Sequence, residues 1–124
     1  MKQDSKPTRP ISIFKSGRKA KDSLREGPTG KLVVIYGGPL GKQYRLGPNR
    51  VLVGRIDRID IAIDDSSVSR EHAVIERKDG RFILEDLKST NGTFVNGECV
   101  DVRVLNHGDK IRIGNTVLQF IVEG

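Results

Sequence analysis

The chain has 124 residues, carries 22 Lys and Arg against 16 Asp and Glu, and has a formal net charge of +6 at pH 7. This length suits one domain with a tail, and the absence of an apolar run near 18 residues argues against membrane insertion and a secretory leader. Cys99 is the only cysteine, so no intrachain disulfide can form, and we expect a cytoplasmic protein.

The positive charge is concentrated at the N-terminal end. Residues 1–30 hold eight Lys and Arg against three Asp and Glu, a net charge of +5, whereas residues 31–124 are nearly neutral at +1. Residues 1–30 are rich in Lys, Arg, Ser, Pro and Gly and have too little apolar surface to offset chain entropy, which predicts a disordered basic tail. The nearly neutral domain predicted over 31–124 argues against a specific nucleic-acid partner.

Strand-length apolar runs begin directly after this tail. Residues 32–36 form a continuous apolar run that Gly37-Gly38-Pro39 ends. Residues 43–46 and 51–53 flank a Gly-Pro-Asn turn, and alternating isoleucines predict a half-buried strand over 59–63.

The second half of the chain is divided by tight turns. Asp79-Gly80 separates the strand-like runs 73–78 and 81–85, and predicts a two-residue hairpin with positive φ at both turn positions. Asn91-Gly92 and Asn96-Gly97 repeat that chemistry, and Gly114-Asn115 separates two further runs. Turn signals every 8–12 residues or so, with no amphipathic helix between them, predict an all-β antiparallel sandwich or barrel.

Three loops carry groups that suit phosphate. Arg55 follows Gly54, and its planar guanidinium fits bidentate contact with phosphate oxygens. Ser69-Arg70-Glu71-His72 adds a hydroxyl and a second guanidinium, and residues 89–93, Ser-Thr-Asn-Gly-Thr, add hydroxyls, an amide and a glycine-freed backbone. The set is better suited to holding a phosphate than to cleaving one, so we predict no catalytic residue.

These motifs, followed by Val95-Asn96-Gly97 and Gly108-Asp109, resemble a forkhead-associated (FHA) domain over about residues 31–124. The resemblance implies an eleven-stranded, SMAD-like antiparallel β-sandwich whose loops at one end bind phosphothreonine peptides. It further implies that phosphate and peptide are bound by Arg55, Ser69, Arg70, Thr90 and Asn91. In this assignment Asn91 bonds the main chain of the peptide, and the others contact phosphate.

Simpler roles stay open for these side chains. Arg55 could form a surface ion pair with Asp57, Ser69 could shape its own turn, and Arg70 could be only solvated. Thr90 and Asn91 could simply form a turn.

A second group is expected to support the loops: Gly54, His72, Gly92, Asn96 and Gly97. By the resemblance, His72 lies beneath the binding loops and holds them by hydrogen bonds. The sequence offers no Ser-His-carboxylate order or metal-ligand cluster, so we predict no metal, no cofactor and no enzymatic activity.

The resemblance also bears on specificity. Some family members place a basic side chain at the Ser67 position to read an acidic residue three after the phosphothreonine; serine here favours an apolar or mixed preference. A small apolar pocket takes the threonine γ-methyl group, and Val68 is a candidate to line it.

The predicted function is a module that binds a phosphothreonine-containing protein or peptide in signalling. The alternatives are a phosphate-independent scaffold, and binding of nucleic acid or an anionic membrane by the basic tail alone. The tail also holds a candidate phosphosite, Thr8, with an apolar Ile11 three positions on and nearby basic residues that suit a basophilic kinase. Phosphorylated Thr8 would be a ligand for its own domain or for a neighbouring copy; an unmodified Thr8 is the alternative.

Overall fold

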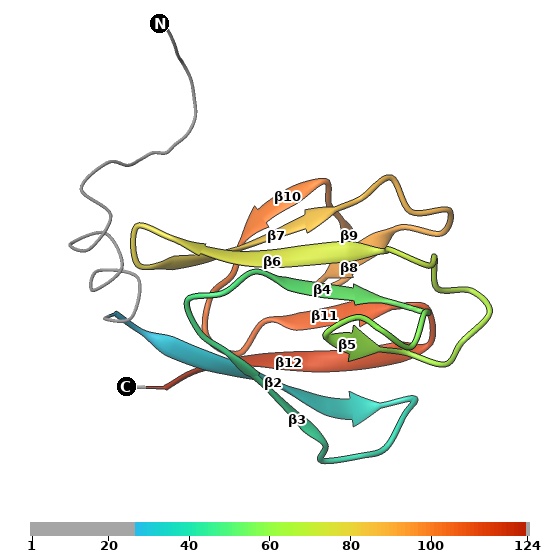
Figure 1. The fold of residues 1–124 in the computed structure, drawn as a ribbon, viewed down its shortest axis with the longest axis horizontal. Coiled ribbons are helices and arrows are strands. Elements are labelled where there is room, and N and C mark those ends of the chain that lie inside the picture. Colours follow the sequence, from blue (N-terminus) through green and yellow to red (C-terminus); the bar gives the residue numbers. More distant parts are fainter. Residues whose placement is uncertain (1–26, 124) are drawn as a thin grey trace, which may run out of the picture.

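The computed structural model describes residues 27–123, which form two stacked β-sheets (Figure 1). No helix occurs in this part of the chain, and none of it could therefore cross a membrane as a helix. The strands are β2 (Thr29–Tyr36), β3 (Gln43–Leu46), β4 (Val51–Gly54), β5 (Ile61–Ala62), β6 (Ala73–Lys78), β7 (Arg81–Asp86), β8 (Thr93–Val95), β9 (Glu98–Cys99), β10 (Val102–Val104), β11 (Lys110–Ile113) and β12 (Thr116–Glu123).

The strands are arranged as a sandwich. One sheet has the order β10-β7-β6-β4-β5, and the other has the order β3-β2-β12-β11-β8-β9. Every pair of neighbouring strands is antiparallel except β4 and β5, where Val53 and Gly54 lie opposite Ile61 and Ala62 in parallel. The predicted antiparallel sandwich is therefore confirmed, with this one parallel pair as its exception.

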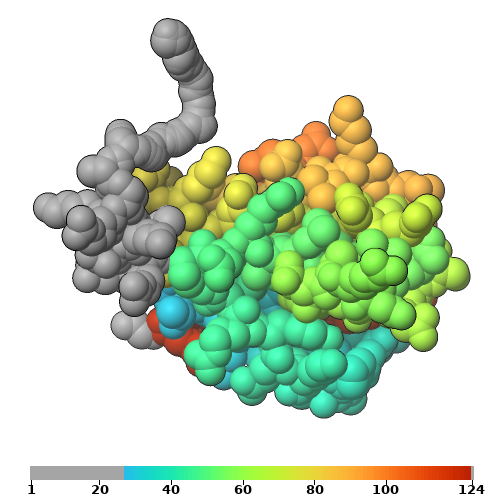
Figure 2. Space-filling view, in the orientation of Figure 1, coloured from blue at the N-terminus to red at the C-terminus, as the bar shows by residue number. Residues whose placement is uncertain are grey.

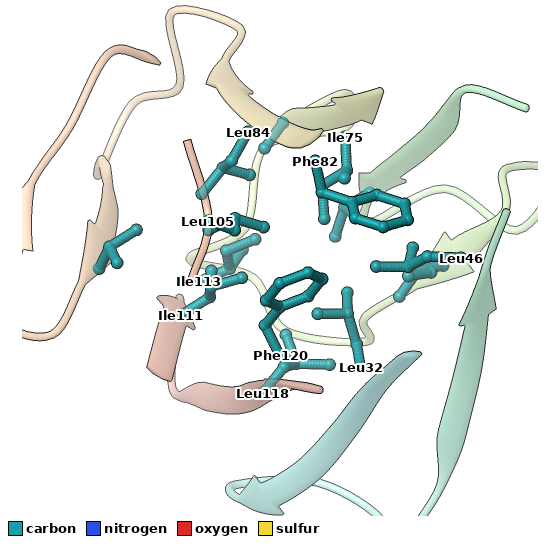
Figure 3. Close-up of a cluster of buried hydrophobic side chains, with 14 of the residues drawn as sticks. Leu32, Leu46, Ile75, Phe82, Leu84, Leu105, Ile111, Ile113, Leu118 and Phe120 are labelled. Carbon is teal, nitrogen blue, oxygen red and sulfur yellow. The ribbon is translucent and has the colours of Figure 1, made fainter. Parts of the chain in front are cut away.

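Alternate side chains of both sheets meet in the core (Figure 3). The rings of Phe82 on β7 and Phe120 on β12 lie edge to face, with centroids 5.4 Å apart, at the centre of this layer. Leu32 on β2 and Leu46 on β3 are each 1% exposed and pack beside them. The period-two burial of these strands is the pattern expected of a sheet with one solvated face.

The predicted turns are realised unevenly. Asp79 and Gly80 have φ values of 53° and 75°, which confirms the predicted hairpin between β6 and β7. Asn96 and Gly97 behave in the same way, at 50° and 88°. Asn91-Gly92 does not, because only Gly92 has positive φ; the prediction of a paired turn there was wrong, and the segment is part of a longer loop.

The strand predicted over residues 59–63 is shortened to the two residues of β5. Asp60, directly before it, turns its carboxylate to β4, and Oδ2 accepts a hydrogen bond of 2.8 Å from the backbone N–H of Leu52. A side chain thus takes the place of a ladder partner, and backbone pairing begins only at Ile61. At the N-terminal end, β2 begins at Thr29, two residues before the predicted start at Lys31. Most of the predicted tail, including Thr8, lies outside the described residues.

The loops that follow β2, β4, β5, β7 and β11 meet at one end of the sandwich, on the right in Figure 1. Hydrogen bonds join them in a chain. Arg55 N–H bonds Ser69 O at 3.1 Å, Asn115 N–H bonds Asp65 at 2.9 Å, and Thr116 Oγ1 bonds Gly37 O at 3.3 Å. The candidate residues lie at this end.

Candidate functional site

His72 holds two of the loops together from below. Its side chain is 0% exposed. Ser69 N–H donates to Nδ1 at 3.0 Å, so the proton of the neutral ring is on Nε2, which donates to the carbonyl of Gly92 at 2.9 Å. Both ring nitrogens are occupied within the protein, so the imidazole is not available as a general base.

Arg55 stands at the end of β4 with its backbone and part of its side chain already fixed. Its N–H is shared between the carbonyls of Ser69 and Arg70, and its Nε donates to the carbonyl of Val68 at 2.9 Å. The residue is exposed, and no ion pair with Asp57 occurs within residues 27–123. The outer N–H groups of its guanidinium therefore remain for a ligand.

Ser69, Thr90 and Asn91 are brought together from two loops. Ser69 Oγ accepts a hydrogen bond of 3.0 Å from Thr90 N–H, which leaves the Ser69 hydroxyl proton free to donate. Asn91 Nδ2 donates to Ser67 O at 2.8 Å, so the amide is held in one orientation with its carbonyl oxygen unused by the described residues. The Thr90 and Asn91 residues are exposed.

Arg70 is placed differently from the other candidates. Its backbone carbonyl supports Arg55, but its exposed side chain lines an open cavity of about 480 Å³ with Ile56, Asp57 and Arg58. The structure describes no hydrogen bond or ion pair made by its guanidinium with residues 27–123. The Arg70 side chain thus lies outside the hydrogen bonds that join Arg55, Ser69, Thr90 and Asn91 to the loops, although the Arg70 backbone takes part in them.

Asp86 supports one of these loops, a role that the sequence did not predict. Its Oδ1 accepts hydrogen bonds from Ser89 Oγ at 2.6 Å and Thr93 Oγ1 at 2.7 Å, and Oδ2 accepts from Ser89 N–H at 3.1 Å. Ser89 Oγ in turn accepts from Gly92 N–H. Partial burial acts to raise the pKa of Asp86, but the hydrogen bonds from Ser89 and Thr93 outweigh it and leave the pKa below its ordinary value.

Asp65 does the same for the neighbouring loop. Its Oδ1 accepts from both the N–H and the hydroxyl of Ser67, and Oδ2 accepts from Asn115 N–H. The bond from Asn115, followed by those from Ser67, lowers the pKa of this carboxyl. The available sequence signal for both acids was an Asp two or three residues before a Ser, the spacing of a side chain that caps its own turn.

Gly54 is required by a close approach of two chains. A Cβ atom at this position would lie 2.0 Å from the carbonyl oxygen of Arg70 and 2.9 Å from Ile59 Cδ1. The carbonyl belongs to backbone that also accepts from Arg55 N–H, so it cannot move without disturbing the site. The role given to Gly54 as loop support therefore has a steric basis.

Asn96 and Gly97 support a different loop. Asn96 Nδ2 donates to Asp109 Oδ1 at 2.9 Å, and Asn96 Oδ1 accepts from Lys110 N–H at 3.0 Å. This contact links the β8–β9 hairpin to the turn before β11, at the end of β11 away from Gly114. Val68 is also placed away from the ligand, since its side chain is 1% exposed and belongs to the core; the proposal that it lines an open methyl pocket was wrong.

The arrangement can bind an anion. The groups left to face solvent are a guanidinium, two hydroxyls and an amide, all of which can donate hydrogen bonds. Within residues 27–123 there is no cluster of three or more His, Cys, Asp or Glu that could hold a metal ion.

Comparison with known proteins agrees with this geometry. The family model for the FHA domain matches residues 51–114, which include the candidate residues from Gly54 to Gly97. The chain belongs to the FHA domain family. One relative, an oxoglutarate dehydrogenase inhibitor from Corynebacterium diphtheriae, is 42% identical over 92 residues, which are 74% of this chain and 64% of the relative.

Two further similarities extend the comparison. The glycogen accumulation regulator GarA of Mycolicibacterium smegmatis is 41% identical over 96 residues, which cover 76% of this chain and 61% of GarA. One similar solved structure comes from a structural and functional analysis of phosphothreonine-dependent FHA domain interactions. The match has a TM-score of 0.71 at 31% sequence identity, and it covers 77% of this chain and 98% of the chain in that structure. The chain therefore spans about three fifths of the length of the two named relatives.

His72→Ala should destabilise the FHA domain. The substitution leaves Ser69 N–H and Gly92 O without their partner, and each unsatisfied buried group costs about 1–3 kcal/mol. We expect the free energy of unfolding, measured by urea denaturation, to fall by about 2 kcal/mol or more. His107→Ala is the matched control, because His107 is exposed. Equal stability of the His72 variant and the wild type would contradict the assigned role.

Asp86 should make stability depend on pH below about 4. Its pKa is lower in the folded chain than the ordinary value of 3.8, so its stabilising contribution is complete above 3.8 and is lost as pH falls through the folded pKa. Asp86→Asn lacks this titration. The stability difference between wild type and Asp86→Asn, measured by denaturation from pH 7 to pH 2.5, should shrink below about pH 3.8. Asp65 is present in both proteins, so its effect on stability cancels in the difference. A stability difference between the two proteins that stays constant down to pH 2.5 would refute the prediction.

Proposed function

We propose that this FHA domain is a phosphothreonine-peptide binding module that mediates phosphorylation-dependent protein–protein interaction in signalling. The observation that carries the proposal is the group formed by Arg55, Ser69, Thr90 and Asn91, which hydrogen bonds within the protein hold together across three loops. Preorganised donors bind an anion with little further loss of conformational freedom.

The phosphate would be bound by charge-assisted hydrogen bonds. A phosphothreonine carries a charge near −1.5 to −2 at pH 7 and offers three acceptor oxygens. We assign those oxygens to the outer N–H groups of Arg55 and the hydroxyls of Ser69 and Thr90. Bonds of this kind contribute on the order of 1.5–3 kcal/mol each, so the loss of Arg55 alone removes most of the affinity of a weak complex.

Asn91 would set the register of the peptide. Its Nδ2 group is held by Ser67 O, which aims the carbonyl oxygen in one direction. That oxygen suits a backbone N–H of the partner. Arg70 would contribute from the side, through the cavity that it lines with Arg58, and not as a primary phosphate ligand.

We further propose that the protein acts by binding rather than by catalysis, in the cytoplasm, and without a nucleic-acid partner. The chemistry of the site supports this: His72 has both ring nitrogens occupied within the protein, and the exposed groups of the site are mostly hydrogen-bond donors. The two relatives described above are named as an inhibitor and a regulator, which supports a regulatory role.

Arg55→Ala should abolish phosphopeptide binding while the domain stays folded. The side chain is exposed and serves the ligand more than the core. Arg50→Ala is the control, because it removes an equal charge from an exposed position in the β3–β4 turn. Calorimetric titration should give no measurable binding for Arg55→Ala and unchanged binding for Arg50→Ala. Equal binding of phosphorylated and plain peptide by the wild type would favour a phosphate-independent scaffold instead.

Binding should also distinguish phosphothreonine from phosphoserine. One buried methyl group contributes roughly 0.8 kcal/mol by transfer alone, which is about fourfold in affinity. Since Val68 is buried, the methyl group would contact the loop surface around the donors. Titration of two peptides that differ only in this methyl group provides the measurement, and equal affinities would count against phosphothreonine specificity.

We also propose that phosphorylated Thr8 is a ligand for the site. The 20 residues between Thr8 and the start of β2 have, as a flexible chain, an r.m.s. span of roughly 25 Å. The eight-residue strand β2 that separates this point from the binding loops is about as long. Binding within one chain is therefore just within reach, and effective concentrations near the mM range would follow.

The Thr8 proposal is tested by phosphorylating the chain and recording backbone NMR shifts at Arg55, Ser69, Thr90 and Asn91. We expect shifts at these residues, dependent on protein concentration only if the contact joins two copies. The phosphorylated Arg55→Ala variant is the control, in which the remaining three should not shift. Unchanged shifts in the phosphorylated wild type at every concentration would exclude both forms.

A further inference from the structure

A cleft opens at the seam between the two sheets, where the edge strands β3 and β5 face each other. Its volume is about 240 Å³. Figure 2 shows the β2–β3 hairpin beside the green β4–β5 segment on this face. The cleft is lined by Val34, Gly37, Gly38, Pro39, Lys42, Tyr44, Ala62, Ile63, Asp64, Thr116 and Leu118.

The floor of the cleft is apolar and part of the core. Val34, Ile63 and Leu118 are at most 8% exposed and belong to the core. Small residues keep the space above them open. Ala62 presents only a methyl group, and a Cβ atom on Gly38 would lie 3.4 Å from Val34 Cγ1 and 3.8 Å from Thr116 Cγ2.

The rim has no excess charge. Lys42 Nζ lies over the ring of Tyr44, 5.2 Å from its centroid, and Asp64 supplies one opposing carboxylate. Beside the cleft, Tyr36 and Leu40 are 67% and 73% exposed. A neutral apolar group fits this environment better than an ion.

A continuous path of contacts leads from the phosphate-facing loops to the cleft. Asn91 bonds Ser67 O, Ser67 bonds Asp65, and Asp65 bonds the N–H of Asn115. The next residue, Thr116, is in the wall of the cleft and donates to Gly37 O. A peptide held by Asn91 that follows the surface over these contacts would therefore reach the cleft.

We propose that the cleft is a specificity subsite that takes one aliphatic or aromatic side chain of the phosphopeptide, several residues from the phosphothreonine. The proposal rests on the proposed function. The occupant is a side chain and not a metabolite, because the volume lies below the roughly 300–1,000 Å³ of small-molecule sites. It belongs to the phosphopeptide because the path from Asn91 ends there.

Filling the cleft tests the proposal. Gly38→Leu places an apolar side chain in it, and the φ of Gly38 is not in the positive range that would strain leucine. Gly47→Leu is the matched control: Gly47 is also free of positive φ, has no atom within 4 Å of a built Cβ, and is in the β3–β4 turn outside this cleft. The full chain of each protein is screened against a peptide library with fixed phosphothreonine and varied flanking positions on both sides.

The wild type and Gly47→Leu should select an apolar side chain at one position several residues from the phosphothreonine, and Gly38→Leu should lose that selection while still requiring phosphate. Replacing the selected residue by alanine should weaken wild-type binding about tenfold. If Gly38→Leu keeps the selection, or the wild type shows none, the subsite is refuted while the proposed function stands. If no protein prefers the phosphorylated library, the proposed function fails, and the subsite with it.

A measurement on the wild type covers the case in which Gly38→Leu does not fold. NMR shifts of Gly38, Ala62 and Thr116 are compared for the selected peptide and its alanine counterpart. The proposal requires shifts at these residues with the selected peptide that diminish with the alanine peptide, while Ser69 and Thr90 respond to both. Identical shifts at the cleft residues for the two peptides would overturn it.

Discussion

The site depends on one neutral, fully buried imidazole. His72 uses all four of its polar groups within the protein: its backbone N–H bonds Val53 O, its carbonyl accepts from Leu87 N–H, and its ring joins Ser69 to Gly92. His72 thus connects strand β4, the loop after β5 and the loop after β7 by hydrogen bonds. A buried polar group of this kind is stabilising only when every partner is present, which makes the loop positions interdependent.

The same network explains how a nearly neutral domain can present an anion site. Carbonyl groups of the loops are consumed internally: Val68 O and Ser69 O by Arg55, Ser67 O by Asn91, and Gly92 O by His72. The carboxylates of Asp65 and Asp86 are likewise turned onto Ser and backbone donors. With these acceptors occupied, the groups left at the surface are mostly donors. Anion selectivity then comes from the orientation of hydrogen bonds and not from net charge.

The sequence was informative where local chemistry decides the structure. Asp79-Gly80 gave a hairpin because both residues tolerate positive φ, and alternating apolar residues marked the strands of the core. Pairings between distant segments were not predictable in this way. The parallel contact of β4 with β5, and the Asp60 carboxylate that shortens β5, depend on which strand the chain meets after its loop.

The candidate site shows the same division. The types and order of residues pointed to Arg55, Ser69, Thr90 and Asn91, whose loops the structure brings together. Val68 was placed less well, because in an irregular loop neighbouring side chains point in different directions without a fixed period. The role of Arg70 stays a prediction. Asp65 and Asp86 were missed because their role is to bond backbone groups of their own loops, and an Asp before a Ser occurs in many ordinary turns.

The cleft between the edge strands β3 and β5 bears on which partners the domain can distinguish. Ala62 and Ile63 line it from β5 and the residue that follows, opposite Tyr44 on β3. Gly38 and Ala62 keep this space open because their side chains are absent or small. Neither is a hydrogen-bond partner of the His72 ring, which bonds Ser69 and Gly92. Substitutions there can change which partner side chain fits while the donors stay in place. Phosphate recognition and partner discrimination therefore use different residues of one sandwich.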